Sequence, residues 1–112
     1  MIEHYSFGKF IVDKKTFESN ITVINDKAKK HRHLPEHQLV LDDFKELVEA
    51  DPDYIIIGTG ASGVVEVPEK IIDFIESKGI KLIIEKTADA CGKYNKMIRQ
   101  GKNIAAFLHN TC

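Results

Sequence analysis

The sequence contains no tryptophan, two cysteines and three prolines among its 112 residues. Cys91 and Cys112 are far apart and form no C-x-x-C motif, so we expect two free thiols and no disulfide framework. No apolar run approaches the roughly 20 residues that a membrane-spanning helix needs. A chain of this length can bury one hydrophobic core without disulfides or a metal, so we expect neither, and no membrane as a partner.

The sequence also lacks an excess of charge of one sign, because 16 Lys and Arg residues face 17 Asp and Glu residues and the formal net charge is -1. Dedicated nucleic-acid-binding domains are usually strongly basic, so nucleic acid is not an expected partner. The first residues, Met1 to Tyr5, show neither the basic-then-apolar pattern of a signal peptide nor the Arg-rich composition of a transit peptide. We therefore expect a cytoplasmic protein.

Hydrophobic residues make up 43% of the chain and charged residues 29%, which is ordinary for one globular domain spanning residues 1–112. The first third is rich in aromatic and β-branched residues, which predicts strands at residues 2–7, 9–12 and 21–24. Residues 27–35 are polar and without periodicity, which predicts a loop. Apolar residues then recur at helical spacing from Leu41 to Val48, and Asp51-Pro52 ends that helix.

The second half alternates between strand and helix patterns. Residues 54–57, 80–85 and 104–108 are continuous apolar runs, which is typical of strands covered on both faces. Helices are expected at residues 69–78 and from Thr87 to the residue before Gly101. Such alternation favours right-handed crossovers and a largely parallel sheet, which the β-rich first third extends or covers. The sequence predicts an α/β domain with three helices.

Gly58, Gly60 and Gly63 follow the strand at residues 54–57 with G-x-G-x-x-G spacing. A dinucleotide site needs such a loop to open directly into a helix, whose N-terminus binds the pyrophosphate. Here residues 64–67 separate the loop from the helix that starts after Pro68, so we expect no NAD or FAD cofactor. Two interpretations remain: the glycines allow a sharp turn with close packing, or their bare amides bind a small anion or ligand.

Other polar residues follow the neighbouring strands. If the three strands of the second half are parallel, Lys86, Thr87 and His109 share one carboxyl edge with the glycine loop, and such edges bind ligands in α/β sheets. The candidate ligand-binding residues are Gly58, Thr59, Gly60, Ala61, Ser62, Gly63, Lys86, Thr87 and His109. No catalytic residue is predicted, since Ser62 lacks the following glycine of a G-x-S-x-G elbow: residue 64 is Val64.

His31, His33 and His37 lie close together in the sequence, but they neighbour a basic run whose charges repel a cation, so we expect a solvated loop and no metal site. The run at residues 27–33 is also a possible contact for an acidic partner, although a charge run is usually only surface. Cys91 lies on the apolar face of its helix and is expected in the core, and Cys112 is expected in a structural tail.

Taken together, the chain resembles the Mth-type domain family over essentially its whole length. The residues that carry the resemblance are Ile55-Ile56-Ile57-Gly58-Thr59-Gly60, Pro68, Glu85-Lys86-Thr87-Ala88, Tyr94-Asn95 and Leu108-His109-Asn110-Thr111-Cys112. The family includes the adipogenesis-associated Mth-type domain protein and the mitochondrial NADH dehydrogenase assembly factor 3, which helps to assemble respiratory complex I. The resemblance implies a single three-layer α/β domain, the Mth-type fold, with a mixed, mostly parallel central sheet and no established catalytic residues.

These patterns favour a non-enzymatic interaction or assembly factor with an unknown protein partner, present as a monomer or a weak homo-oligomer. The alternative is a small-molecule or anion binder, or a weak enzyme, that uses the loop at residues 58–63. A binder is expected to have a concave pocket with inward polar groups at that edge. An interaction protein is expected to expose an apolar patch.

The separation of the glycine loop from the next helix leads to a first prediction. Isothermal titration calorimetry with NAD and with FAD should detect no tight binding, because residues 64–67 separate the loop from the helix that follows it, and the N-terminus of that helix is not placed to bind the pyrophosphate. A dissociation constant in the micromolar range for either dinucleotide would contradict this interpretation of the loop.

Overall fold

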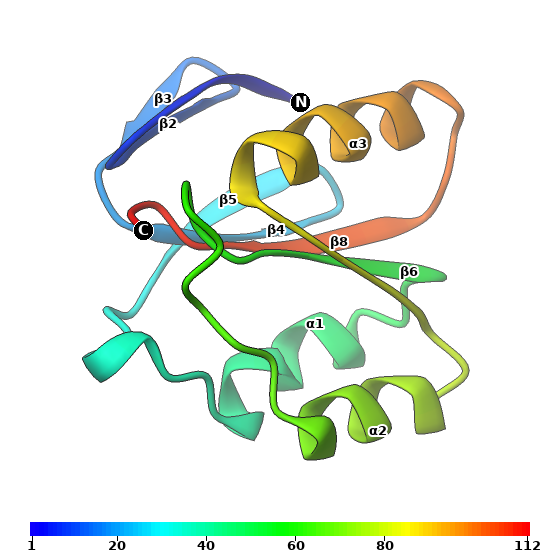
Figure 1. Ribbon diagram of the computed structural model, residues 1–112. Coiled ribbons are helices and arrows are strands. Elements are labelled where there is room, and N and C mark those ends of the chain that lie inside the picture. Colours follow the sequence, from blue (N-terminus) through cyan, green and yellow to red (C-terminus); the bar gives the residue numbers. More distant parts are fainter.

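The computed structural model describes all residues from 1 to 112 and has the three-layer α/β architecture that the sequence predicts (Figure 1). Its strands and helices are β1 (Ile2–Ser6), β2 (Lys9–Val12), β3 (Lys15–Phe17), β4 (Asn20–Ile24), β5 (Lys27–His31), α1 (Lys45–Glu49), β6 (Tyr54–Gly58), α2 (Glu69–Ser77), β7 (Lys81–Glu85), α3 (Thr87–Arg99) and β8 (Ile104–Leu108). Two short 3₁₀ turns, η1 (Pro35–His37) and η2 (Leu41–Phe44), precede α1.

The central sheet has five strands in the order β5-β4-β8-β6-β7 and is mixed. Strand β6 runs parallel to both β7 and β8, with Ile56 opposite Ile83 and Ala106. Strand β4 is antiparallel to β8 and to β5. The predicted fold class is therefore confirmed, including the adjacent parallel strands at residues 54–57 and 80–84.

Alternation along β6 divides its side chains between two cores. Ile55 and Ile57 belong to the core on the side of α1 and α2, together with Leu47, Ile71 and Phe107. Ile56 belongs to the opposite core, which lies beneath α3 and the small sheet of β1, β2 and β3. Helices α1 and α2 lie below the sheet in Figure 1 and α3 lies above it. Both faces of β6 are thus covered, as its continuous apolar sequence indicated.

The second core also contains Cys91 of α3, which is 7% exposed, as its place on the apolar face predicted. Burial raises the pKa of its thiol to about 12, so this cysteine is an inert packing residue.

The predicted loop at residues 27–35 is wrong for its first half, which forms the edge strand β5. A two-residue turn at Asn25 and Asp26, with φ of 53° and 60°, reverses the chain and pairs β5 with β4. Two consecutive left-handed residues make the type of turn that matches the twist of a hairpin. The lysines of β5 hide the strand pattern, although lysine is common on edge strands, where charge prevents pairing with other chains.

The sequence also missed the short strand β3, and it overestimated the burial of β7. Strand β7 lies at the other edge of the sheet, and Ile84 on it is 42% exposed. The first third of the chain both extends the central sheet, through β4 and β5, and covers it, through the separate sheet of β1, β2 and β3.

The burial of β6 leads to a prediction for stability. Ile56→Asp should unfold the domain, because Ile56 is 0% exposed and an unpaired buried carboxylate costs several kcal/mol of a total stability of roughly 5 to 15 kcal/mol. The matched control is Ile84→Asp on the neighbouring edge strand, which should remain folded. Circular dichroism melting compares the two variants, and a cooperative wild-type-like melt of Ile56→Asp would contradict the observed burial.

Candidate functional site

The carboxyl ends of β6, β7 and β8 meet at one edge of the sheet and bring the nine predicted ligand-binding residues together. The amide of His109 donates to the carbonyl oxygen of Gly58 at 3.0 Å, and the amide of Thr59 donates to the carbonyl oxygen of Glu85 at 2.9 Å. These bonds continue the parallel ladders just beyond the strands. The sequence placed these residues together on the condition that the three strands are parallel. Strands β6, β7 and β8 are parallel, and their carboxyl ends share one edge.

Thr87, the first residue of α3, ties this edge together. Its side chain is fully buried, and its hydroxyl accepts a hydrogen bond from the amide of Gly60 at 2.8 Å and donates one to the carbonyl oxygen of His109 at 2.9 Å. Its own amide donates to the carbonyl oxygen of Gly60 at 3.1 Å. One hydroxyl therefore connects the chain segments that leave β6, β7 and β8.

Two glycines of the loop are required by close packing. A Cβ atom at Gly58 would lie 2.9 Å from both the Leu108 side chain and the Thr87 hydroxyl oxygen. Gly60 has φ of 108°, and a Cβ atom there would overlap the carbonyl group of Cys112. Both positions exclude any larger residue, so the G-x-G of this sequence has a packing role in the fold.

Most of the amides of the glycine loop bind acceptors within the chain. Ala61 donates to the carbonyl oxygen of Thr111 at 2.8 Å, Val64 to that of Cys112 at 3.0 Å, and Gly63 to that of Gly60 at 3.3 Å. The Ser62 amide has no acceptor in the chain. The Lys86 side chain lies against Gly63, so the loop offers one free amide beside one cation. Ligand binding by this loop stays a prediction.

His109 is 3% exposed, and both nitrogens of its ring are engaged. Asn20 Oδ1 accepts from the Asn110 amide at 3.0 Å and lies 2.8 Å from His109 Nδ1, so that nitrogen carries the proton and donates. His109 Nε2 accepts from the Thr111 hydroxyl at 3.2 Å. Burial, with smaller contributions from the nearby His37 and His33, lowers the pKa of His109 to about 4. The ring is a neutral structural group.

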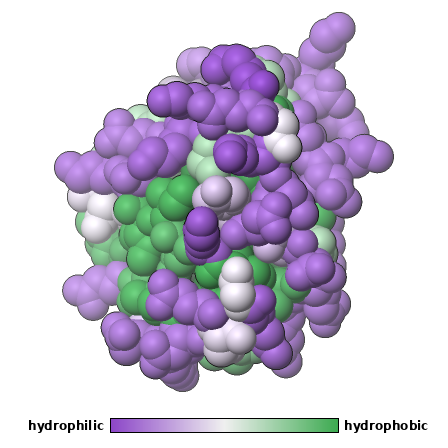
Figure 2. Space-filling model, turned by 90° about the vertical axis from the view of Figure 1, so that its right-hand side faces the viewer, coloured by the Kyte–Doolittle hydropathy of each residue, from purple (hydrophilic) through white to green (hydrophobic).

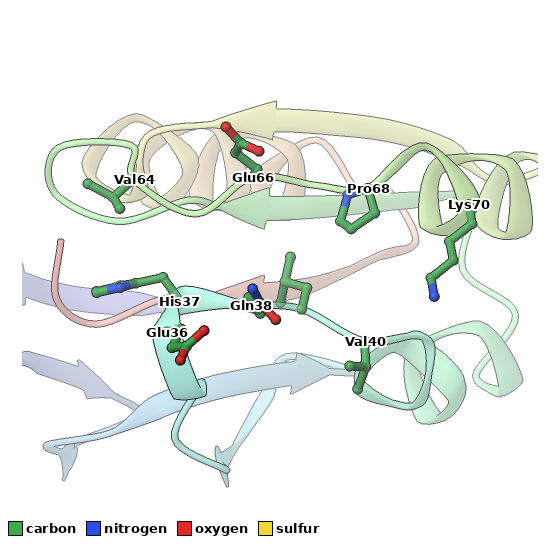
Figure 3. Close-up of a pocket in the computed structure, with 9 residues that line it drawn as sticks. Glu36, His37, Gln38, Val40, Val64, Glu66, Pro68 and Lys70 are labelled. Atoms are coloured by element: carbon green, nitrogen blue, oxygen red, sulfur yellow. The ribbon is translucent and has the colours of Figure 1, made fainter.

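The largest hollow of the molecule lies beside this edge and was not predicted from the sequence. It has a volume of about 540 Å³ and lies between the segment at residues 36–40 and the segment at residues 64–70 (Figure 3). The residues that line it, here called the groove, are Glu36, His37, Gln38, Leu39, Val40, Val64, Glu66, Pro68 and Lys70. Val40 on one wall is 45% exposed, and Val64 on the other is 49% exposed.

The first wall of the groove depends on an unusual backbone. Glu36 and His37 have φ of 54° and 58°, the left-handed region that residues other than glycine rarely adopt. Buried Leu34 and Leu39 anchor this turn at its two ends. The His37 ring packs edge-on against the His109 ring, with 5.4 Å between centroids. Strained backbone of this kind persists where the surrounding structure holds it and is frequent at functional sites.

A buried carboxylate fixes the other end of that wall. Asp43 is 4% exposed and accepts hydrogen bonds from His31 Nε2 at 2.7 Å, from Arg32 Nε and Nη2 at 2.8 Å each, and from the Val40 amide at 2.8 Å. Burial alone raises the pKa of this carboxyl, but the four hydrogen bonds and the Arg32 charge outweigh it and lower the pKa to about 2. Val40 is therefore held in place by residues of β5 and the segment after it.

This cluster corrects the interpretation of the histidines as a solvated loop for His31 and His37, whereas His33 is exposed as expected. His31 binds Asp43 and lies edge-on against the Phe107 ring at 5.2 Å, whereas His37 packs against His109. The two rings thus have different partners. No group of three or more His, Cys, Asp or Glu side chains is placed to hold a metal ion.

A family model described as "Protein of unknown function (DUF498/DUF598)" matches residues 2–109. The chain belongs to this family. Among solved structures, MT938 is 24% identical, with 100% of this chain and 98% of that chain covered and a TM-score of 0.81. The conserved hypothetical protein PH1505 from Pyrococcus horikoshii OT3 is 23% identical, with 100% and 99% covered and a TM-score of 0.86. An outer membrane protein from Bartonella henselae is 19% identical, with 99% and 94% covered and a TM-score of 0.88.

These likenesses show that the chain shares its fold with these proteins of known structure. A further similar structure, that of a protein from Bordetella pertussis, is described as a Mth938-like domain, and so the resemblance to the Mth-type family is confirmed. None of the helices of this DUF498 chain has the length and apolar character needed to cross a membrane.

The buried His109 ring leads to a prediction for pH dependence. The folded pKa of about 4 lies below the ordinary value of 6.5, so the unfolded chain takes up a proton that the folded chain rejects. Stability should therefore fall as the pH drops from about 6.5 to about 4, by roughly 3 kcal/mol in total. His109→Gln should flatten this slope in urea unfolding measured at several pH values.

The matched control is His4→Gln, a change at an exposed histidine, which should leave the slope as it is in the wild type. An unchanged slope in His109→Gln would show that the ring does not contribute to the pH dependence.

Proposed function

We propose that this DUF498 protein is a cytoplasmic, non-enzymatic interaction factor of the assembly type, and that an extended segment of a partner protein docks in the groove. The observation that carries the proposal is the exposure of Val40 and Val64, which stand on opposite walls of an open hollow. Exposed apolar surface with a polar rim is typical of interaction sites. Cys91 and Cys112 are free thiols, in keeping with a reducing compartment.

Charged side chains of both signs surround these two valines. Glu36, Glu66 and Lys70 line the groove, and none of them has an ion-pair partner within the chain. Figure 3 shows the Lys70 side chain extending from the start of α2 toward the opposite wall. Apolar contacts bordered by polar and charged groups are the usual arrangement of a protein interface. A partner segment that presents an apolar side chain between charges of both signs fits this lining.

The polar groups of the groove favour binding over catalysis. Catalysis by a hydroxyl or thiol nucleophile needs that group hydrogen-bonded to a base, and no Ser, Thr, Tyr or Cys lines the groove. In the groove the only ring nitrogens belong to His37, which contacts the His109 ring and makes no side-chain hydrogen bond. The resemblance to an assembly factor of the Mth-type family supports the same choice.

The alternative function is binding of a small anion or ligand by the loop at residues 58–63 with Lys86, Thr87 and His109. The free Ser62 amide beside Lys86 supports it. Against it, the Thr87 hydroxyl and the His109 ring already bind other groups of the chain. A single amide and a single exposed cation would give weak affinity for an anion, with a dissociation constant of roughly 1 mM.

Capture experiments test the docking proposal. The tagged wild type, a Val40→Glu/Val64→Glu double variant and a Phe7→Glu control are expressed in the native cell, lightly cross-linked, and compared by quantitative mass spectrometry. Phe7 is 64% exposed and lies outside the groove. The control variant therefore also replaces an exposed hydrophobic side chain with glutamate, but away from the proposed docking site. A specific partner should be recovered with the wild type and with Phe7→Glu, and should fall about tenfold or more with the double variant, because buried glutamates oppose docking.

Equal recovery with all three proteins, from variants that melt like the wild type, would contradict docking in the groove. A phosphate titration followed by NMR tests the alternative independently. Shifts of the Gly60, Ser62 and Gly63 amides at millimolar phosphate, with unchanged groove residues, would favour the anion-binding role.

A further inference from the structure

Strand β7 leaves one edge of the central sheet unpaired. It is the last strand in the order β5-β4-β8-β6-β7, and in Figure 1 the segment between α2 and α3 crosses in front of β6. Figure 2 turns the molecule so that this front lies toward the left, where hydrophobic surface gathers among hydrophilic side chains. Ile84 on β7 is one of the few large hydrophobic residues that the molecule exposes.

The backbone of β7 is poised to pair on that side. The Lys81 amide donates to the Asp53 carbonyl oxygen, and the Glu85 carbonyl oxygen accepts from the Thr59 amide, so odd-numbered residues bond to β6. Hydrogen-bonding groups alternate along a strand, and the N–H and C=O groups of Leu82 and Ile84 therefore point away from β6. These are the groups that a further strand would use.

The sequence of β7 is complementary to itself when it is read in the opposite direction. Antiparallel pairing about Ile83 places Lys81 opposite Glu85 of a second copy, and Leu82 opposite Ile84 of that copy. In the same register Leu82 and Ile84, whose N–H and C=O groups point away from β6, lie opposite one another. A hydrogen-bonded antiparallel pair requires this arrangement of the backbone groups. Charge, apolar pairing and backbone direction agree on one register.

We propose that the protein associates with a second copy of itself through antiparallel pairing of β7 with β7, about a two-fold axis at Ile83. The central sheet then continues across both copies. Each Ile84 side chain is covered by Leu82 of the other copy, and each Glu85 gains Lys81 of the other copy beside its own partner Lys93, which lies 3.4 Å away.

The opposite edge of the sheet does not offer the same pairing. Strand β5 carries Lys27, Lys29 and Lys30 and no acidic residue, so two copies of it would bring like charges together. Lysines on an edge strand are a common device against such association. Of the two edges of the central sheet, β7 is therefore the one suited to joining copies of this chain.

The interface is small, since it consists of one five-residue strand and its side chains. Stable interfaces usually bury about 1,600 Å², so we expect weak association with a dissociation constant of roughly 10 to 500 µM. The dimer should therefore form only at high protein concentration.

Charge reversal tests the register. Sedimentation velocity should show a monomer–dimer equilibrium for the wild type. Lys81→Glu and Glu85→Lys should each weaken it about tenfold or more, because each homodimer then has like charges opposite one another at both ends of the pair. An equimolar mixture of the two variants should restore the dimer, because both cross-strand pairs of the mixed dimer are again of opposite sign. Both changed side chains are partly exposed, so the variants should fold.

Amide hydrogen exchange provides a second measurement with an internal control. At high concentration the Leu82 and Ile84 amides should become protected, whereas those of Ile83 and Glu85, which face β6, should be protected at every concentration. A protein that stays monomeric up to about 1 mM, well above the range expected for so small an interface, would overturn the proposal. A dimer that neither variant weakens, or that the mixture fails to restore, would also overturn it.

Discussion

The buried hydroxyl of Thr87 holds together the segments that leave three parallel strands, and the arrangement of the surrounding edge depends on it. It bonds to the amide of Gly60 and to the carbonyl oxygen of His109. This requires the backbone of β6 to approach α3 so closely that only glycine fits at Gly58. The position of His109 then places its ring against His37 and so connects the edge with the groove. A short chain of contacts thus relates sheet, helix and groove.

The central part of the fold could be predicted from the sequence because it depends on local patterns. Strand β6 is a continuous apolar run, and the helices α2 and α3 have apolar residues at helical spacing, so burial alone determines them. The two edge strands of the central sheet were harder to predict from the sequence. Strand β5 is held by its turn and its pairing with β4, and its lysines give no apolar signal. Strand β7 has an apolar sequence although one side of it is unpaired.

The candidate site could likewise be predicted from the sequence only in part. Alternation of strands and helices was enough to bring the glycine loop, Lys86, Thr87 and His109 to one edge. The roles of these residues were not predictable, because they depend on packing between distant segments, such as the contact of Gly60 with Cys112. The groove was missed because its wall rests on two left-handed residues and on the hydrogen bonds of Asp43, none of which a sequence pattern indicates.

The position of β8 in the sheet affects how the chain can fold during synthesis. Strand β8 is the last strand along the chain, yet it lies between β4 and β6 and is the link between the antiparallel and parallel halves of the sheet. Until the ribosome has released residues 104–108, neither half can complete its ladder or close its core. Until then, the edges of β4 and β6 that pair with β8 stay unpaired. Contacts between segments far apart in the sequence also form slowly. Closure of both cores should therefore be a single late event in folding.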